Sequence, residues 1–155
     1  MFWCEVEGLD ELERAAEQSD RELQKGVLRA VTDATSEGAQ EARSTHVYQD
    51  RTGDLTRSTK GRVIGGGGGD VDGEIVADMP YASFVDGGTE PHEIHAKNGP
   101  NLKFKVGDRW VSTPVVHHPG TRADAFMGRA LQKAERVLLR EGEVAAEIVV
   151  KIMES

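Results

Sequence analysis

The chain has 155 residues, a net charge of −8 with its histidines neutral, and one cysteine, Cys4. This length suffices for a substantial core without disulfides or structural metals, so we expect a single domain over residues 1–155. One cysteine excludes an internal disulfide and cysteine-rich zinc frameworks, and the acidic balance argues against general binding to phosphate backbones, which relies on Lys and Arg.

The opening MFWCEVEGLDE has no basic region followed by an apolar core, and no stretch of the chain approaches about 18 apolar residues. We therefore expect a soluble protein that is not secreted through a signal peptide and does not contact a membrane. Phe2, Cys4 and Val6 alternate with polar or bulky residues, which predicts a short strand.

A long helix is predicted from Leu9 to about Thr45, because apolar or small residues recur every three or four positions and no proline intervenes. It would be about 55 Å long, which is more than a small core needs, so part of it is expected to pack on a partner subunit. Its predicted seam consists of Leu9, Leu12, Ala16, Ser19, Leu23, Gly26, Ala30, Ala34 and Gly38.

The segment VYQDRTGDLTRS ends this helix with residue types that favour a tight turn, centred on Thr52 to Asp54. Extended structure is expected to resume at Leu55. The following GRVIGGGGGDVDGEIVAD predicts two strands, Arg62–Ile64 and Glu74–Ala77, joined by five consecutive glycines. We expect the hairpin tip, residues 65–73, to be mobile.

In PYASFVDGG, Pro80 begins a predicted helical turn that two glycines end. We expect Tyr81, Phe84 and Val85 to pack this turn on the sheet, with Phe84 buried. The loop at 87–101 should be mobile. The next segment, LKFKVGDRWVSTPVV, alternates apolar and basic residues around GD and predicts a hairpin.

A last helix is predicted after HPGTRAD, with an interruption or kink allowed at Gly142. The order of elements predicts an α+β fold in which the N-terminal and C-terminal helices pack on an antiparallel sheet with extended hairpin loops. The predicted inner face of the last helix contains Phe126, Ala130, Leu131, Ala134, Val137, Leu138, Ala145, Ile148 and Ile152.

Four of the five histidines fall in two short segments, HEIH at His92 and His95, and VVHHPG at His117 and His118. Neutral imidazole is a common zinc ligand, but a Pro-flanked extended HEIH does not reproduce the helical HExxH geometry. VVHHPG resembles the start of a metal-finger nuclease site, yet no His, Asn or Cys follows it. We expect interface histidines and no metal, with a metal-dependent hydrolase or nuclease as the alternative.

Other patterns give no support for an enzyme. GGGGGDVDG lacks the Lys and Ser or Thr of a phosphate-binding loop, and its acidic residues do not have the spacing of a calcium loop. No GxSxG segment is present, and nothing around Cys4 resembles a nucleophile signature. We therefore expect no catalytic residue and no cofactor.

Arg129, Lys133, Arg136 and Arg140 are spaced by four, three and four residues, so they share one stripe of the last helix, whereas the first helix has an acidic excess. Two interpretations remain open. The stripe can be a solvated face, or it can pair with the acidic helix of a neighbouring copy.

Three segments together, VYQDRTGDLTRS, ADMPYASFVDGGTEPH and HPGTRADAFMGRAL, resemble the tail-completion, or neck, proteins of long-tailed double-stranded-DNA bacteriophages, the family that includes minor tail protein Z. The resemblance covers the chain from about VEGLDEL to Leu131 and rests on the order and spacing of short motifs. The matching residues are Thr52, Gly53, Leu55, Ser58, Tyr81, Ala82, Phe84, Val85, Gly88, Thr89, Pro119, Gly120, Phe126 and Ala130. The chain departs from the family pattern at Asp86, Gly87 and Ala125.

The resemblance implies a structural role and no reaction. Copies would assemble, as a six-fold ring, at the head–tail junction of the virion and join the head connector to the tail terminator or tail tube. The protein would be made in the host cytoplasm, and DNA would pass through the ring without sequence-specific binding. A tail terminator or a head-closure ring of the same neck is the alternative. His92, His95 and the basic stripe are the expected interface residues.

Overall fold

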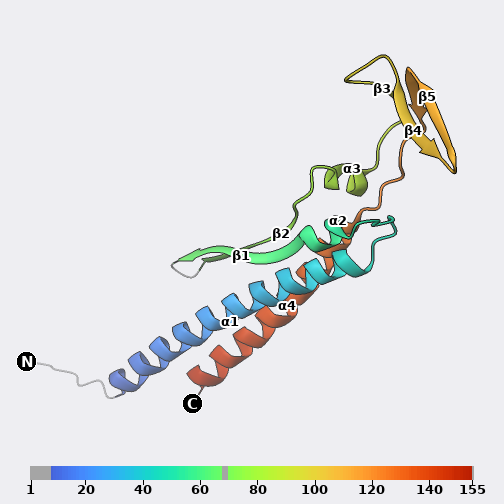
Figure 1. Cartoon of the computed structure of the whole chain (residues 1–155). Helices are drawn as coiled ribbons and strands as arrows, with labels where there is room; N and C mark the ends of the chain where they lie inside the picture. Colours follow the sequence, from blue (N-terminus) through green and yellow to red (C-terminus); the bar gives the residue numbers. More distant parts are fainter. Residues whose placement is uncertain (1–7, 68–69, 155) are drawn as a thin grey trace, which may run out of the picture. The chain divides into compact units, whose positions relative to one another are not determined.

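The computed structural model describes residues 8–67 and 70–154 (Figure 1). The strand predicted at Phe2 to Val6 lies outside the described residues. The chain combines long helices with small antiparallel sheets, so the predicted α+β class is confirmed. The elements in chain order are α1 (Leu9–Ser44), α2 (Asp54–Ser58), β1 (Thr59–Gly67), β2 (Asp70–Ala77), α3 (Ala82–Gly87), β3 (His92–His95), β4 (Leu102–Val106), β5 (Arg109–Thr113), β6 (Val115–His118) and α4 (Phe126–Met153).

The elements form two compact units. The helical unit contains α1, α2, β1, β2 and α4. The small unit contains Val47–Gln49 and Pro80–Ala125, and therefore α3 and the strands β3 to β6. No helix in the described part of the chain is both long enough and apolar enough to span a membrane.

In the helical unit, α1 and α4 lie side by side and the β1–β2 hairpin packs on α1 (Figure 1). The small residues of the predicted seam allow this close packing. A Cβ atom added at Gly38 would lie 2.9 Å from the carbonyl oxygen of Ala130 on α4 and 2.5 Å from a methyl group of Ile75. The buried apolar residues of this unit are Ala30, Ala34, Ala39, Ala42, Leu55, Phe126, Ala130, Val137 and Ala145.

Both helices have nearly the predicted bounds, and α4 continues through Gly142 without interruption. The predicted faces are only partly buried. Several large side chains that were expected in the seam or on the inner face are exposed. On α1 the buried apolar residues lie between Ala30 and Ala42, so the leucines that precede them lie outside the apolar core, while Leu131 and Leu138 on α4 line an open groove. These exposed residues are Leu9, Leu12 and Leu23 on α1, and Leu131, Leu138 and Ile148 on α4.

The expectation that extended structure resumes at Leu55 was wrong, because Asp54–Ser58 forms the short helix α2 and the strand starts at Thr59. The Asp50 carboxylate explains the extra turn. It accepts hydrogen bonds from the backbone N–H groups of Gly53 and Thr56, both at 2.9 Å, and thereby satisfies donors at the start of the helix. Gly53 precedes α2 with a φ of 73°, which favours glycine.

The β1–β2 hairpin includes both predicted strands and extends further toward its tip. It runs from the pair Thr59 and Ala77 to the pair Gly67 and Asp70, with a register shift between Val63 and Gly65. In the small unit, β4 and β5 form the predicted hairpin around Gly107, while β3 pairs with β6. β3 lies within the predicted loop 87–101. The strands are thus divided among three two-stranded sheets in the described residues.

Candidate functional site

The three segments that carry the family resemblance contribute to one hydrogen-bonded arrangement in the small unit. Its centre is Asp124, which is 7% exposed. One oxygen of its carboxylate accepts the backbone N–H groups of Val47 at 2.7 Å and Tyr48 at 2.8 Å. The backbone N–H of Asp124 donates to the carbonyl of Val85. A single buried acid therefore connects the start of the first motif, the α3 segment and the last motif.

A short backbone bridge joins the second and third motifs next to Asp124. Thr89 and Thr121 exchange two N–H···O hydrogen bonds of 2.9 and 3.0 Å, and their hydroxyl groups are 2.7 Å apart. Gly88, with a φ of 72°, and Gly120, with a φ of 84°, flank this bridge. A Cβ atom at either glycine would lie 2.5 Å or less from a backbone oxygen across the bridge, so both motif glycines are required by geometry. Pro119 connects Gly120 to the end of β6.

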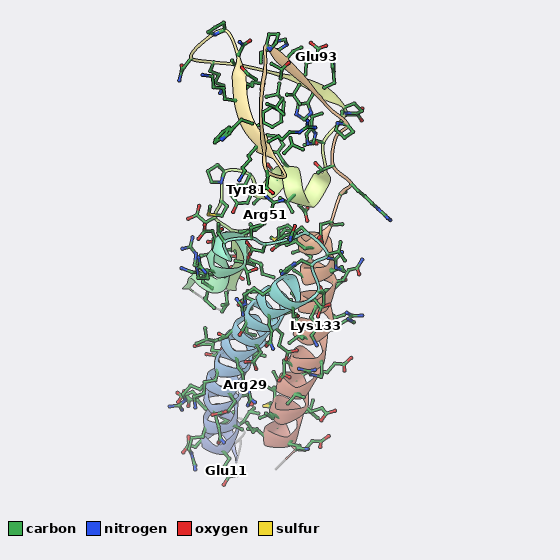
Figure 2. All side chains as sticks on the ribbon, turned by 45° about the vertical axis from the view of Figure 1, so that its right-hand side comes forward. Glu11, Arg29, Arg51, Tyr81, Glu93 and Lys133 are labelled. Atoms are coloured by element: carbon green, nitrogen blue, oxygen red, sulfur yellow. The ribbon has the colours of Figure 1, made fainter. Side chains whose placement is uncertain are left out.

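Beside Asp124 the small unit contains an open hollow of about 400 Å³. Tyr81, Phe84 and Val85 from the α3 segment line one part of it, and Val47 and Ala123 line another. Figure 2 shows Tyr81 at the start of α3.

The expectation that Phe84 is buried was wrong, because its side chain is 60% exposed. The cause is the shortness of α3, whose six residues turn only Ala82 into the interior. Tyr81 is also 40% exposed, so the hollow presents two aromatic side chains to solvent.

The other motif residues lie in the helical unit and shape its core or its turn. Leu55, Phe126 and Ala130 are at most 1% exposed. The Thr52 hydroxyl accepts the backbone N–H of Asp54, and the Ser58 hydroxyl donates to the carbonyl of Leu55. These residues therefore support the core of the unit and the turn before α2.

The four histidines of interest come together on the β3–β6 ribbon, with two on each face. His92 pairs with His118 across the strands, and their rings are 5.0 Å apart. On the other face, the two carboxylate oxygens of Glu93 each lie 3.2 Å from a ring nitrogen, one of His95 and one of His117. The extended form of HEIH is confirmed.

Glu93, His92 and His95 are exposed, and so is His117. The part of the chain that the structure describes contains no group of three or more His, Cys, Asp or Glu side chains that could hold a metal ion. What the ribbon can do is pair a carboxylate with imidazolium when the imidazoles are protonated.

The predicted basic stripe on α4 mostly contacts α1 of the same chain. The Lys133 ammonium group lies 2.9 Å from one oxygen of Glu37, and the Arg140 guanidinium lies 3.4 Å from the other. Arg129 donates to the backbone carbonyl of Thr45 at 3.1 Å. The hydrogen bond from Lys133, with support from Arg140, lowers the pKa of the Glu37 carboxyl. Arg136 is exposed on the same helix.

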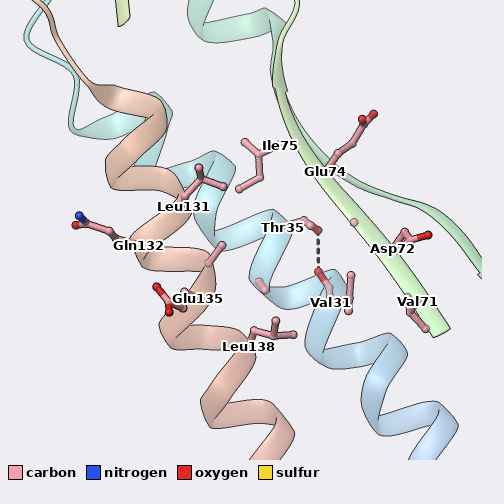
Figure 3. Close-up of a pocket in the computed structure, with 13 residues that line it drawn as sticks. Val31, Thr35, Val71, Asp72, Glu74, Ile75, Leu131, Gln132, Glu135 and Leu138 are labelled. Atoms are coloured by element: carbon pink, nitrogen blue, oxygen red, sulfur yellow. Dashed lines mark hydrogen bonds between the residues drawn. The ribbon is translucent and has the colours of Figure 1, made fainter. Parts of the chain in front are cut away.

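The helical unit has a groove of about 480 Å³ that sequence reasoning missed (Figure 3). Val31 and Thr35 on α1, Ile75 on β2, and Leu131 and Leu138 on α4 line it. Its other lining residues include the acidic side chains of Asp72, Glu74 and Glu135. The signal that could have indicated this groove is the apolar stripe of α4, which is wider than the face that α1 alone can bury.

No known protein family, no curated protein and no solved structure matches this chain.

Proposed function

We propose that this chain is a structural protein of a bacteriophage neck, which assembles as a ring between the DNA-filled head and the tail and lets DNA pass through. The observation that carries the proposal is the meeting of the motif segments at Asp124. Residues of all three segments contribute to that arrangement although more than 70 positions separate Val47 from Asp124 along the chain. Motifs that were matched on order and spacing alone thus belong to the same hydrogen-bonded arrangement.

The distribution of apolar surface also supports an assembly role. Leu9, Leu12 and Leu23 leave the seam side of α1 exposed, and Leu139 and Val150 are exposed on α4. A partner subunit can cover apolar side chains that are left exposed in this way. The hollow with Tyr81 and Phe84 adds an aromatic patch, and aromatic side chains are enriched in protein interfaces.

The direct test is to interrupt the coding sequence in the phage genome and to examine the particles by electron microscopy. We expect DNA-filled heads and separate complete tails, and joined particles again when the native chain is supplied from a plasmid. A chain with Phe126→Asp, which places a charge in the core, is the matched control and should not restore joining. Joined virions of normal shape without the chain would contradict the proposal.

Immunogold labelling of the separated heads and tails, after incubation with the purified native chain, distinguishes a layer that binds heads from a layer that binds tails. A tail-completion protein and a tail terminator are expected on the head-proximal end of tails, whereas a head-closure protein is expected on heads. Labelling of neither structure, together with labelling of soluble fractions only, would contradict every layer of the neck.

A further inference from the structure

We propose that the β4–β5 hairpin of one copy docks into the groove beside β2 of a second copy, with Trp110 as its apolar anchor and Lys103 and Lys105 facing the acidic groove. This contact rests on the ring assembly of the proposed function and states which two surfaces of the chain form it. The hairpin exposes Trp110 and Lys103, while its Lys105 ammonium group lies 3.5 Å from the Asp108 carboxylate, and the groove exposes apolar side chains.

The groove offers an apolar floor with a charged rim. Val31, Leu131 and Leu138 provide apolar side chains from two helices (Figure 3). Leu131 is 59% exposed, which shows that this side of α4 lacks a cover. Along the groove, β2 pairs with β1 only, as far as the described strands show, and β1 contributes nothing to the lining. An extended segment from another molecule can therefore lie along β2.

The rim of the groove is acidic. Asp72, Glu74 and Glu135 are among its lining residues. Glu74 is paired with Arg62 on the neighbouring strand. Asp72 and Glu135 make no ion pair with any described residue. The groove thus has two carboxylates for which a cationic partner would be favourable.

The hairpin has the complementary character. Lys105 lies opposite Trp110 and Lys103 lies opposite Ser112, so one face of the ribbon carries an indole and two ammonium groups. Trp110 is 75% exposed, more than any other described aromatic side chain. The other face holds Phe104 and Val111, which are half-buried.

The hairpin and the β2 side of the groove carry charge of opposite sign, although the chain as a whole is acidic. The hairpin and the residues leading to it contain Lys97, Lys103, Lys105 and Arg109 against one acid, Asp108. The segment from residue 70 to 78 contains Asp70, Asp72, Glu74 and Asp78 and no basic residue. Complementary charge of this kind orients two surfaces and speeds their encounter, while a central Trp contributes most of the binding free energy.

The proposed contact is of the type that can build a ring. The hairpin belongs to the small unit and the groove to the helical unit, so the contact uses two different surfaces of the same chain. Such a head-to-tail contact leaves one hairpin and one groove free in any open oligomer, and it gives a closed ring when the rotation between neighbouring copies closes. A contact between identical patches would stop at a dimer.

An exposed Trp with neighbouring Lys side chains is also typical of surfaces that stack on single-stranded nucleic acid. That alternative gives no role to the acidic groove. We favour the groove of a second copy because an apolar, oppositely charged receptor of sufficient size is present on the same chain.

The test is a charge exchange measured by sedimentation velocity on the purified full chain. The hairpin variant combines Lys103→Glu with Lys105→Glu, and the groove variant combines Asp72→Lys with Glu135→Lys. Each variant alone opposes like charges, so we expect it to stay monomeric. In an equimolar mixture each hairpin finds a groove of opposite charge, so we expect assembly to return, with the two chains alternating.

Two further variants sharpen the test. Trp110→Ala should weaken self-association about 30-fold or more, as the loss of a central interface Trp does. Reversal of Glu147 and Lys151, which are exposed elsewhere on α4, is the matched control and should leave assembly unchanged. Circular dichroism confirms that each variant remains folded.

Three results would overturn the proposal. The first is a native chain that stays monomeric up to about 1 mM, where even a weak contact is populated. The second concerns a chain that combines the hairpin substitutions with the groove substitutions. If this chain self-associates like the native chain while the mixture of the two single variants does not, the hairpin and the groove contact each other within one molecule. The third is that the groove variant still self-associates while the hairpin variant loses binding to a single-stranded oligonucleotide that the native chain binds. The hairpin would then be a nucleic-acid surface and not a contact for the groove. None of these needs virions, so failure here is distinguishable from failure of the neck assignment in the particle experiment.

Discussion

The helical unit and the small unit are each stabilised internally by a different kind of interaction. Among the described residues, the helical unit buries nine apolar side chains along α1, α2 and α4, including Phe126 and Leu55, whereas the small unit buries only Ala82. In place of a core, the small unit has the Asp124 carboxylate and the Thr89–Thr121 bridge. The helical unit therefore gains stability from apolar area, while the small unit depends on a few hydrogen bonds and on surfaces that a partner can cover.

The largest expected effect contrasts two phenylalanines. Phe126 is fully buried in the helical unit, so Phe126→Ala should lower the free energy of unfolding by about 3–5 kcal/mol. Phe84 is mostly exposed in the small unit, and Phe84→Ala should change it by less than about 0.5 kcal/mol. Urea unfolding of both variants measures the difference. Equal losses would mean that the two units do not differ in the way described.

A smaller and local effect is expected at Asp124. Asp124→Ala removes the acceptor for the Val47 and Tyr48 N–H groups and should cost about 1–3 kcal/mol. Asp124→Asn keeps one acceptor oxygen and should cost less. Hydrogen exchange should report faster opening across the small unit and unchanged protection in α1 and α4. Uniform loss of protection in both units would contradict the separation.

The smallest effect is expected from a fall in pH, which should lower the stability of the helical unit more than that of the small unit. The Lys133 hydrogen bond lowers the pKa of Glu37, and the hydroxyl and N–H of Thr56 lower the pKa of Asp50. A carboxyl whose folded pKa is depressed stabilises the fold above its unfolded pKa of about 4, and this contribution is lost as the pH falls through the lower folded pKa. Thermal unfolding between about pH 5 and 2 should therefore show a decline that Glu37→Gln reduces. An identical decline in that variant would remove Glu37 from the explanation.

Local sequence signals predicted α1, α3, α4 and the β4–β5 hairpin, although not α2, because helical periodicity and the GD turn act over short distances. The pairing of β3 with β6 was missed, since positions that lie 20 to 26 residues apart leave no local trace of their register. Asp124 was missed for a similar reason. A lone Asp in GTRAD looks like any loop acid, and only the fold brings the N–H groups of Val47 and Tyr48 to it.

Exposure was the least predictable property. Phe84 and Leu131 have the character of core residues in the sequence, yet both are exposed in the single chain. An interface residue and a core residue share the same chemistry, and the pattern does not tell which chain provides the cover. The basic stripe shows the opposite. One interpretation of the sequence paired it with the acidic helix of a neighbouring copy, but Lys133 and Arg140 pair with Glu37 on α1 of the same chain.

Cryo-electron microscopy of the neck in intact virions tests the central claim most directly. We expect a closed ring of copies of this chain between head and tail, in which the β4–β5 hairpin of each copy lies against β2 and α4 of the next and Trp110 points into the groove. A neck whose density is fully explained by other proteins would contradict a role of this chain in the neck.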